Sequence, residues 1–273
     1  MLFLGVDLAW ADSTAERAGN ETGVVALDEA GTVLDAGWTR GVDETAAWVQ
    51  RAVGGRQNAL LFVDAPLVVT NPGGQRLCET QVGQRYGRWK VSANTTNLAT
   101  PRLAGVTLRE RLETAGWDYD DGWDGPSTRG RAMSECYPYT TLVGVERLGF
   151  DEERPRYKRK PRAMATAEFR PLRARACDEI LRRLGALPAA DPPLDLASHP
   201  VTRRLLDEPS PLGDVEYKHR EDLLDAAICA WTAALWHRSG FGACQVLGPR
   251  PSDDDRRPAT IVAPARPVQR RDD

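Results

Sequence analysis

The order of the apolar segments in the first quarter of the chain constrains the fold most strongly. Three strand-like segments come first, followed by an amphipathic helix and then a short, continuously apolar strand. A tight turn over residues 28–31 joins the second and third strands, so the chain opens with an antiparallel meander. The five segments are Leu2–Trp10, Gly23–Leu27, Thr32–Arg40, a helix Glu44–Val53 capped by Asp43, and Ala59–Val63.

Helical and strand-like patterns continue along the rest of the chain, which indicates an α/β fold with a mixed sheet flanked by helices. We expect one domain over residues 1–255, with an insertion at about 139–218 before the last long helix. Residues 191–213 are expected to be a proline-rich connection, and residues 256–273 a frayed tail apart from one strand. The later helices are expected near Gln75–Arg85, Arg102–Ala115, Thr166–Leu184 and Arg220–His237, and the later strands at Arg131–Cys136 and Thr260–Ala263.

Charge and cysteine content limit the classes of function. The formal net charge is −3 with 27% charged residues, so no global positive field draws the protein onto nucleic acid or an anionic membrane. Only four of the 36 basic residues are lysine, so arginine clusters carry less functional information than usual. The five scattered cysteines favour a reduced, cytoplasmic location. The apolar run Leu223–Trp236 is shorter than the roughly 20 residues that a membrane helix needs, so no membrane partner is expected.

Two aspartates interrupt or end apolar strands. Asp7 lies inside the first apolar segment, and Asp64 follows the fourth strand. A carboxylate in such a position is costly to bury unless it is paired or binds a cation. Alternation places Asp7 on the same side of its strand as Gly5 and Ala9, small residues that would leave room for a ligand or a metal ion. Either aspartate alone is equally consistent with a turn or capping residue, but the two together favour a site.

Acids also precede the apolar part of the last long helix. Asp222 and Asp225 lie three residues apart and therefore share one helix face. The helix dipole favours acids in a first turn, which explains Glu221 and Asp222 better than Asp225, because small apolar residues follow Asp225 without a break. Asp225 is therefore the stronger candidate for a ligand. Glu135 ends a predicted strand, where it either points to the same edge of the sheet or is an ordinary surface glutamate.

Four short motifs occur in a fixed order: GVDLAW from residue 5, FVDAPL from 62, ECYP from 135 and EDLLDAAICAW from 221. In this order the chain resembles the family called domain of unknown function 429, whose members are predicted nucleases with an RNase H-like fold. The closing helix is similar to that of RuvC-type resolvases, in which two aspartates three apart precede an alanine-rich stretch. Polar segments with Arg76 and Glu79, and with Lys158 and Lys160, also resemble segments of that family.

The resemblance implies a divalent metal site in which Mg²⁺ or Mn²⁺ is held by oxygen ligands. One or two such ions would activate water and stabilise the leaving oxygen in phosphodiester hydrolysis. The acids implied are Asp7, Asp64 and Asp225, with Glu135 or Asp222 as a fourth. The residues that would neutralise phosphate are Arg76, Lys158, Arg159, Lys160, Lys218 and His219, although a charge run is commonly only a solvated loop.

Two features depart from the RuvC-like pattern. Asp64 stands where RuvC-like nucleases place a glutamate, so its reach to a metal ion is shorter, and the insertion has no counterpart in a minimal RNase H. The primary hypothesis is a metal-dependent nuclease that acts on nucleic acid. The alternative is a non-catalytic or small-molecule-binding RNase H-like domain whose acids hold a structural cation. The near-neutral net charge favours this alternative slightly.

Overall fold

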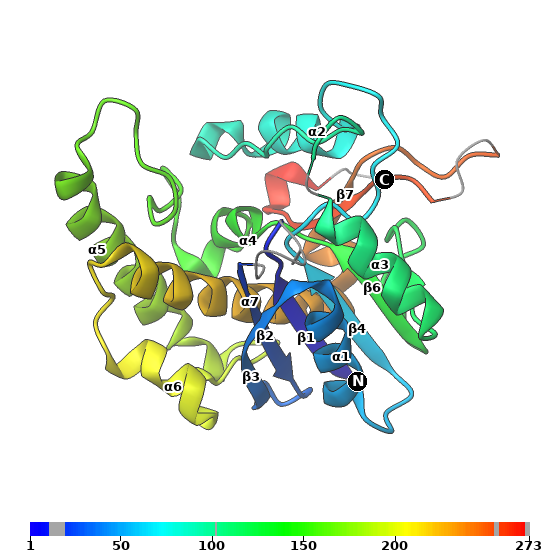
Figure 1. The fold of residues 1–273 in the computed structure, drawn as a ribbon, viewed down its shortest axis with the longest axis horizontal. Helices are drawn as coiled ribbons and strands as arrows, with labels where there is room; N and C mark the ends of the chain where they lie inside the picture. Colours follow the sequence, from blue (N-terminus) through cyan, green and yellow to red (C-terminus); the bar gives the residue numbers. More distant parts are fainter. Residues whose placement is uncertain (11–19, 102, 254–256, 271–273) are drawn as a thin grey trace.

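A six-stranded mixed sheet forms the centre of the protein (Figure 1). The structure is a computed structural model, and it describes residues 1–10, 20–101, 103–253 and 257–270. The strands lie side by side in the order β3-β2-β1-β4-β6-β5. Their bounds are β1 Leu2–Asp7, β2 Glu21–Leu27, β3 Val33–Arg40, β4 Ala59–Val63, β5 Asp118–Tyr119 and β6 Arg131–Glu135.

The direction of the central strands decides where the acids lie. β1 runs antiparallel to β2 and parallel to β4, and β4 runs parallel to β6. The register pairs Val6 with Val63, and Val63 with Glu135. The carboxyl ends of the parallel strands β1, β4 and β6 therefore lie at the same edge of the sheet. Three acids lie at this edge, namely Asp7, Asp64 and Glu135.

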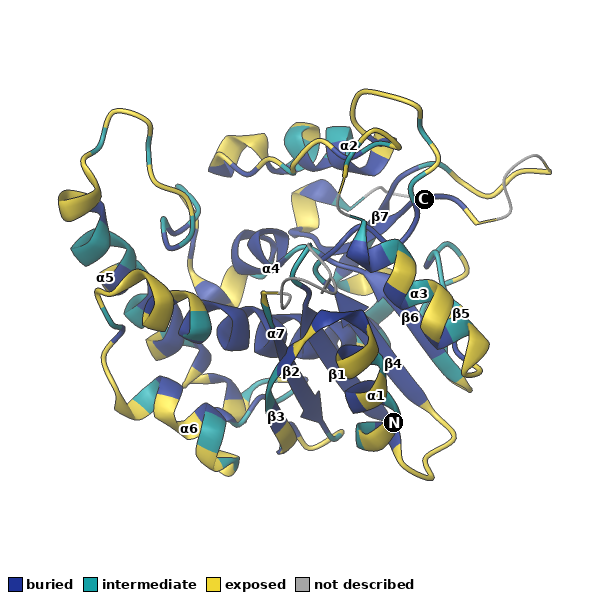
Figure 2. Cartoon of the chain, in the orientation of Figure 1, coloured by how far each residue is buried: buried dark blue, intermediate teal, exposed yellow. Residues whose placement is uncertain are grey.

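Helices cover both faces of the sheet, as an RNase H-like α/β fold requires (Figure 1). They are α1 Gly41–Val53, α2 Leu77–Tyr86, α3 Ala104–Thr114, α4 Pro138–Gly144, α5 Thr166–Leu184, α6 Pro200–Asp207 and α7 Asp214–Ser239. α1 and α3 pack on one face against Leu4 and Val6, and α7 packs on the other against Phe3. α7 is buried continuously from Arg220 to Trp236 (Figure 2), because α4, α5 and α6 contact it away from the sheet. None of the helices in the described residues is long and apolar enough to cross a membrane.

Two glycines in neighbouring strands let α7 approach the sheet closely. A Cβ atom at Gly5 would overlap the backbone of Ala226, and one at Gly23 would overlap the carbonyl group of Asp222. We expected Gly5 to leave room for a ligand, and this interpretation is wrong because the backbone of α7 fills the space. This close approach instead places Asp222 and Asp225 of α7 beside β1, the strand that ends in Asp7.

Some elements differ from those that the sequence pattern predicts. Residues 191–213 contain α6, which begins at Pro200 and is capped by the side chain of His199, so they are not only a connection. α1 begins at Gly41, which places Asp43 in the first turn instead of at the cap. α4 and β7 have no counterpart among the predicted elements. A second, antiparallel sheet consists of β7 Cys244–Leu247 and β8 Ile261–Pro264.

The end of the chain is held firmly where the structure describes it. The guanidinium group of Arg266 is buried, donates to the carbonyl oxygens of Val143 (2.8 Å) and Phe150 (3.0 Å), and pairs with Asp151 (2.6 Å). The prediction of a frayed tail is therefore wrong for residues 257–270. Residues 256 and 271–273 of that predicted tail lie outside the described residues, as does Arg102, the predicted start of a helix.

Candidate metal centre

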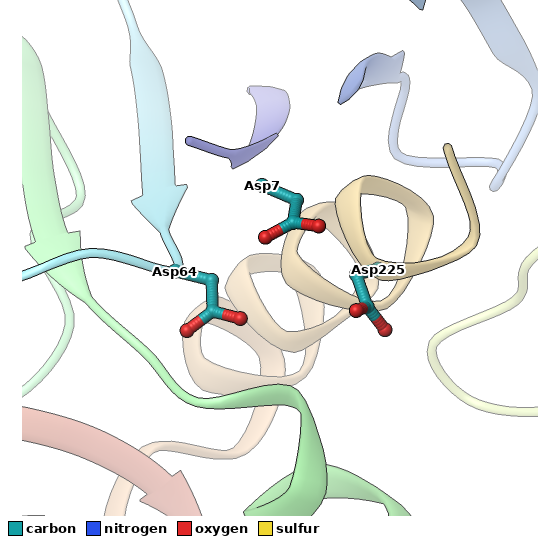
Figure 3. Close-up of side chains that lie close together, drawn as sticks. All are labelled: Asp7, Asp64 and Asp225. Atoms are coloured by element: carbon teal, nitrogen blue, oxygen red, sulfur yellow. The ribbon is translucent and has the colours of Figure 1, made fainter. Parts of the chain in front are cut away.

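Three aspartates from distant parts of the sequence meet at the edge of the sheet (Figure 3). Asp7 is the last residue of β1, Asp64 follows β4 directly, and Asp225 lies on α7. One carboxylate oxygen from each residue lies within 4.8 Å of the other two. We call these three residues the aspartate cluster. The structure thus brings together the aspartates that the sequence motifs singled out.

The aspartate cluster is buried and incompletely hydrogen-bonded. Asp7 is 8% exposed and Asp225 is 0% exposed. Oδ2 of Asp7 has no hydrogen-bond partner among the described residues. A buried carboxylate oxygen without a partner costs free energy unless a cation lies beside it. Carboxylate oxygens are the ligands of hard divalent cations, so this donor set fits such an ion.

Burial disfavours the charged form of the cluster. Burial raises the pKa of Asp64 to about 7 and the pKa of Asp225 to about 8. The negative charge of Asp7 adds to both increases, whereas the ammonium group of Lys158 opposes them. The protein alone therefore stabilises the anions only partly, and a divalent cation would supply the missing positive charge.

Lys158 lies in the segment predicted to be an insertion, and its side chain extends into the aspartate cluster. Its Nζ forms an ion pair with Asp225 and lies 3.5 Å from Oδ2 of Asp64. The preceding residue, Tyr157, is fully buried and donates a hydrogen bond of 2.7 Å to Oδ1 of Asp225. Sequence reasoning named Lys158 but missed Tyr157. An aromatic residue directly before a lysine was not a distinguishing signal, because Lys90 and Lys218 also follow aromatic residues.

A second lysine neutralises the other acids of α7. Nζ of Lys218 forms an ion pair with Asp222 and lies 3.2 Å from Glu221 and 4.0 Å from Asp7. Burial raises the pKa of Asp222 to about 9, and the charge of Asp7 adds to the increase. Because α7 begins at Asp214, Asp222 lies about two turns inside the helix. The explanation of Asp222 as a first-turn acid is therefore wrong.

Glu135 lies at the same edge of the sheet but is held by an arginine. Arg76 donates hydrogen bonds of 2.7 and 2.8 Å to the two oxygens of Glu135, and its Nε donates one of 2.8 Å to Glu79. The backbone nitrogen of Leu67 also donates to Glu135, at 3.1 Å. We call Arg76, Glu79 and Glu135 the arginine cluster. All three residues of the arginine cluster line the same cavity as Asp7 and Asp64, so Glu135 and Arg76 lie beside the aspartates although each already has a partner of opposite charge.

Two further basic candidates lie outside the aspartate cluster. Lys160 is exposed, and its Nζ donates to the carbonyl oxygen of Met164 at 2.7 Å. The ring of His219 stacks on Trp38 with 3.5 Å between the ring centroids, and its Nδ1 lies 2.6 Å from Glu21. Among the described residues, neither side chain contacts the three aspartates. Both would meet a ligand only if it extended beyond the centre of the site.

A cavity of about 290 Å³ opens at the aspartate cluster. Pockets that bind small molecules in proteins measure roughly 300–1,000 Å³, so this cavity lies at the small end of that range. Its walls carry charges of both signs and several aromatic rings. The lining includes Asp7, Asp64, Lys158, Arg159, Lys218, Glu221, Asp222, Trp10, Tyr137 and Tyr139.

The family of the chain follows from its comparison with known proteins. None of the curated proteins or solved structures compared matches the chain. The family described as Protein of unknown function (DUF429) matches residues 5–252, a range that contains the whole aspartate cluster and α7. The resemblance indicated by the four sequence motifs is thereby confirmed, and the chain belongs to the DUF429 family.

Proposed function

We propose that this protein is a divalent-metal-dependent nuclease that hydrolyses phosphodiester bonds in nucleic acid. The observation that carries the proposal is the convergence of Asp7, Asp64 and Asp225, of which Asp7 and Asp64 line a cavity that Lys158 and Lys218 also line. Phosphodiester hydrolysis requires an activated water and positive charge around the phosphoryl group. Carboxylates that hold a divalent cation beside ammonium groups meet both requirements.

Each residue of the site has a defined part in this proposal. Asp7, Asp64 and Asp225 hold Mg²⁺ or Mn²⁺, with Asp7 as the central ligand. Held by these three carboxylates, a divalent ion would supply an activated water and positive charge for the leaving oxygen. Tyr157 keeps Asp225 oriented through its hydrogen bond, as outer residues commonly do for metal ligands. Lys158 lines the cavity and attracts the phosphate group.

One observation favours a second function. The cavity is small, about 290 Å³, and its walls also carry Glu21, Glu221 and Asp222. Together with a net charge of −3, these acids repel a long polyanion. The competing proposal is a non-catalytic or small-molecule-binding RNase H-like domain whose aspartates hold a structural cation.

Cleavage assays separate the two proposals. Branched and single-stranded DNA and RNA oligonucleotides are incubated with the parent protein in Mg²⁺ or Mn²⁺ and, as a control, in EDTA. The nuclease proposal expects cleavage of at least one substrate only in the metal. It also expects no cleavage by a folded Asp7→Asn variant, in which the central ligand is altered. Cleavage that survives in Asp7→Asn, or a complete lack of binding at low salt, supports the competing proposal.

Binding can be measured apart from cleavage when Ca²⁺ replaces the active metal. Phosphate contacts release counterions, so the affinity of the parent protein for an oligonucleotide should fall steeply as salt rises. Lys160→Ala should weaken binding and flatten the logarithmic salt slope by about one, because one phosphate contact is lost. Lys90→Ala is the matched control, since Lys90 is exposed and pairs with Glu153 away from the cavity lining. An unchanged slope in Lys160→Ala excludes Lys160 from the binding surface.

A further inference from the structure

The positive charge already present in the aspartate cluster limits the number of metal ions that it can take. Nζ of Lys158 pairs with Asp225 and lies 3.5 Å from Asp64, so it contacts two of the three proposed ligands. We infer that the Lys158 ammonium group permanently occupies one of two cation positions in the cluster, and that the site therefore binds a single divalent ion. This inference rests on the metal site of the proposed function but not on which bond is cleaved.

The backbone beside Lys158 is anchored on two sides, which keeps the ammonium group in place. The Tyr157 hydroxyl donates to Asp225 at 2.7 Å, and the Tyr157 carbonyl oxygen accepts a hydrogen bond of 2.6 Å from Tyr217. Nζ of Lys158 also lies 5.6 Å from the ring centroid of Tyr157 and 5.8 Å from that of Tyr139, within cation–π range. Movement of Lys158 into solvent would give up the aromatic contacts together with the ion pair.

Formal charge leads to the same number of ions. The three aspartates bring three negative charges and Lys158 brings one positive charge. One divalent ion makes this group neutral, whereas a second would leave two uncompensated positive charges in a buried site, which is costly. Asp222 and Glu221 share one ammonium group, that of Lys218, so they add one negative charge beside the cluster, and a second divalent ion would still leave one positive charge uncompensated.

A place for the single ion remains on the side of Asp7. Oδ2 of Asp7 is buried and has no hydrogen-bond partner among the described residues. The ammonium group of Lys218 is 4.0 Å from Asp7 and is already paired with Asp222. Lys158 forms no ion pair with Asp7 in the described residues, so its ammonium group leaves this position open.

Counting bound Mn²⁺ by equilibrium dialysis and elemental analysis tests the inference. Ions that a folded Asp7→Asn variant also retains are subtracted. The parent protein should hold one Mn²⁺, and Lys158→Met should hold two, because the lost ammonium group vacates a cation position. Lys160→Met is the matched control: Lys160 lies two residues away, contacts Met164 and should leave the count at one.

Electron paramagnetic resonance of the Mn²⁺-saturated parent protein gives an answer that needs no variant to fold. An isolated ion should give a six-line spectrum, whereas two ions about 4 Å apart would give an exchange-coupled one. Two ions in the parent protein, an exchange-coupled spectrum, or one ion in a folded Lys158→Met variant would overturn the inference. One bound ion without cleavage of any oligonucleotide would support the inference and contradict the nuclease proposal.

Discussion

The arginine cluster and the aspartate cluster both bury carboxylates at the same edge of the sheet, yet they differ in how the protein compensates the charge. Arg76 donates two parallel hydrogen bonds to Glu135 and a third to Glu79. Its planar guanidinium group therefore compensates the charge of both acids. In the aspartate cluster, Lys158 pairs with Asp225, whereas Oδ2 of Asp7 has no hydrogen-bond partner among the described residues and lies 4.0 Å from Nζ of Lys218. Of the two clusters, only the aspartate cluster has a buried carboxylate oxygen without a hydrogen bond among the described residues.

This difference shows why burial of acids does not by itself identify a metal site. The arginine cluster supplies its own counter-charge with suitable geometry and so acts as a structural tie between α2 and β6. In the aspartate cluster, burial raises the pKa of Asp64 and of Asp225 in spite of the Lys158 ammonium group. Burial also raises the pKa of Glu135, so the hydrogen-bond partners and not the pKa distinguish the two clusters. The comparison predicts opposite responses of the two clusters to mutation and to metal ions.

The largest effect is expected from removing the arginine. Arg76→Met leaves Glu79 and Glu135 buried without their counter-charge, and breaking a buried ion pair in this way costs about 3–5 kcal/mol of unfolding free energy. Urea denaturation measures the loss, and Mg²⁺ should not restore it. Recovery of stability in Mg²⁺ would mean that this cluster also binds metal, and the distinction between the clusters would fail.

The aspartate cluster should respond to metal in the opposite way. A divalent ion that binds only the folded state, at about one hundred times its dissociation constant, stabilises by roughly 2.7 kcal/mol. Mn²⁺ should therefore raise the melting temperature of the parent protein. Asp7→Asn and Asp225→Asn should reduce this rise strongly, and Asp222→Asn should do so less. An equal response in all four proteins would place the ion elsewhere.

The stability of the metal-free protein should depend on pH through the aspartate cluster. The pKa values of about 7 for Asp64 and about 8 for Asp225 exceed their unfolded value near 4, so the folded state binds more protons in between. Unfolding free energy should therefore fall as pH rises from about 5 to 8, by up to about 1.4 kcal/mol per pH unit for each extra proton. Urea denaturation in EDTA measures this slope.

Asp225→Asn should flatten that slope, because it removes one of the three aspartates, Asp64, Asp222 and Asp225, whose pKa is raised. Stabilisation by Mg²⁺ should grow over the same pH range, since metal ligands must be deprotonated. A metal-free protein that becomes more stable between pH 6 and pH 8 would contradict the prediction.

The smallest effect is expected from Asp7→Asn without metal. Asp7 raises the pKa of Asp64, Asp222 and Asp225 by repulsion, so its replacement by a neutral isostere should stabilise the metal-free fold by on the order of 1 kcal/mol. A circular-dichroism melt in EDTA checks the direction. Loss of the fold would mean that Asp7 is a structural residue like Glu135, and the two clusters would no longer differ in kind.

The metal centre was predictable from sequence where the signal is local. Asp7 stands out because it interrupts an apolar segment, and Asp64 because it directly follows an apolar strand. Asp225 stands out because small apolar residues follow it. The mixed sheet with flanking helices followed from the order of apolar periods. α6 was missed because proline usually ends a helix, whereas Pro200 stands at the first helical position, where its missing N–H costs nothing.

Pairing between distant side chains had no such signal. Arg76 and Glu135 are 59 residues apart, and Tyr157 and Asp225 are 68 apart. Periodicity shows which face of an element a residue occupies, but not which side chain of another element meets it. The family resemblance implied that Arg76 binds phosphate, and the contacts of Tyr157 and Lys158 with Asp225 were recognised only in the structure.

Gly5 and Gly23 have a consequence for ion selectivity, because they set the gap between the strands and α7. Mg²⁺ requires ligands at 2.0–2.1 Å in a nearly octahedral array, whereas Ca²⁺ accepts 2.3–2.6 Å and looser arrangements. A methyl group at Gly5 would push α7, and Asp225 with it, away from Asp7 while leaving every ligand in the chain. If the aspartate cluster holds an ion, Gly5→Ala should then favour the larger one, and the choice of metal would depend on two residues that have no side chain to offer it.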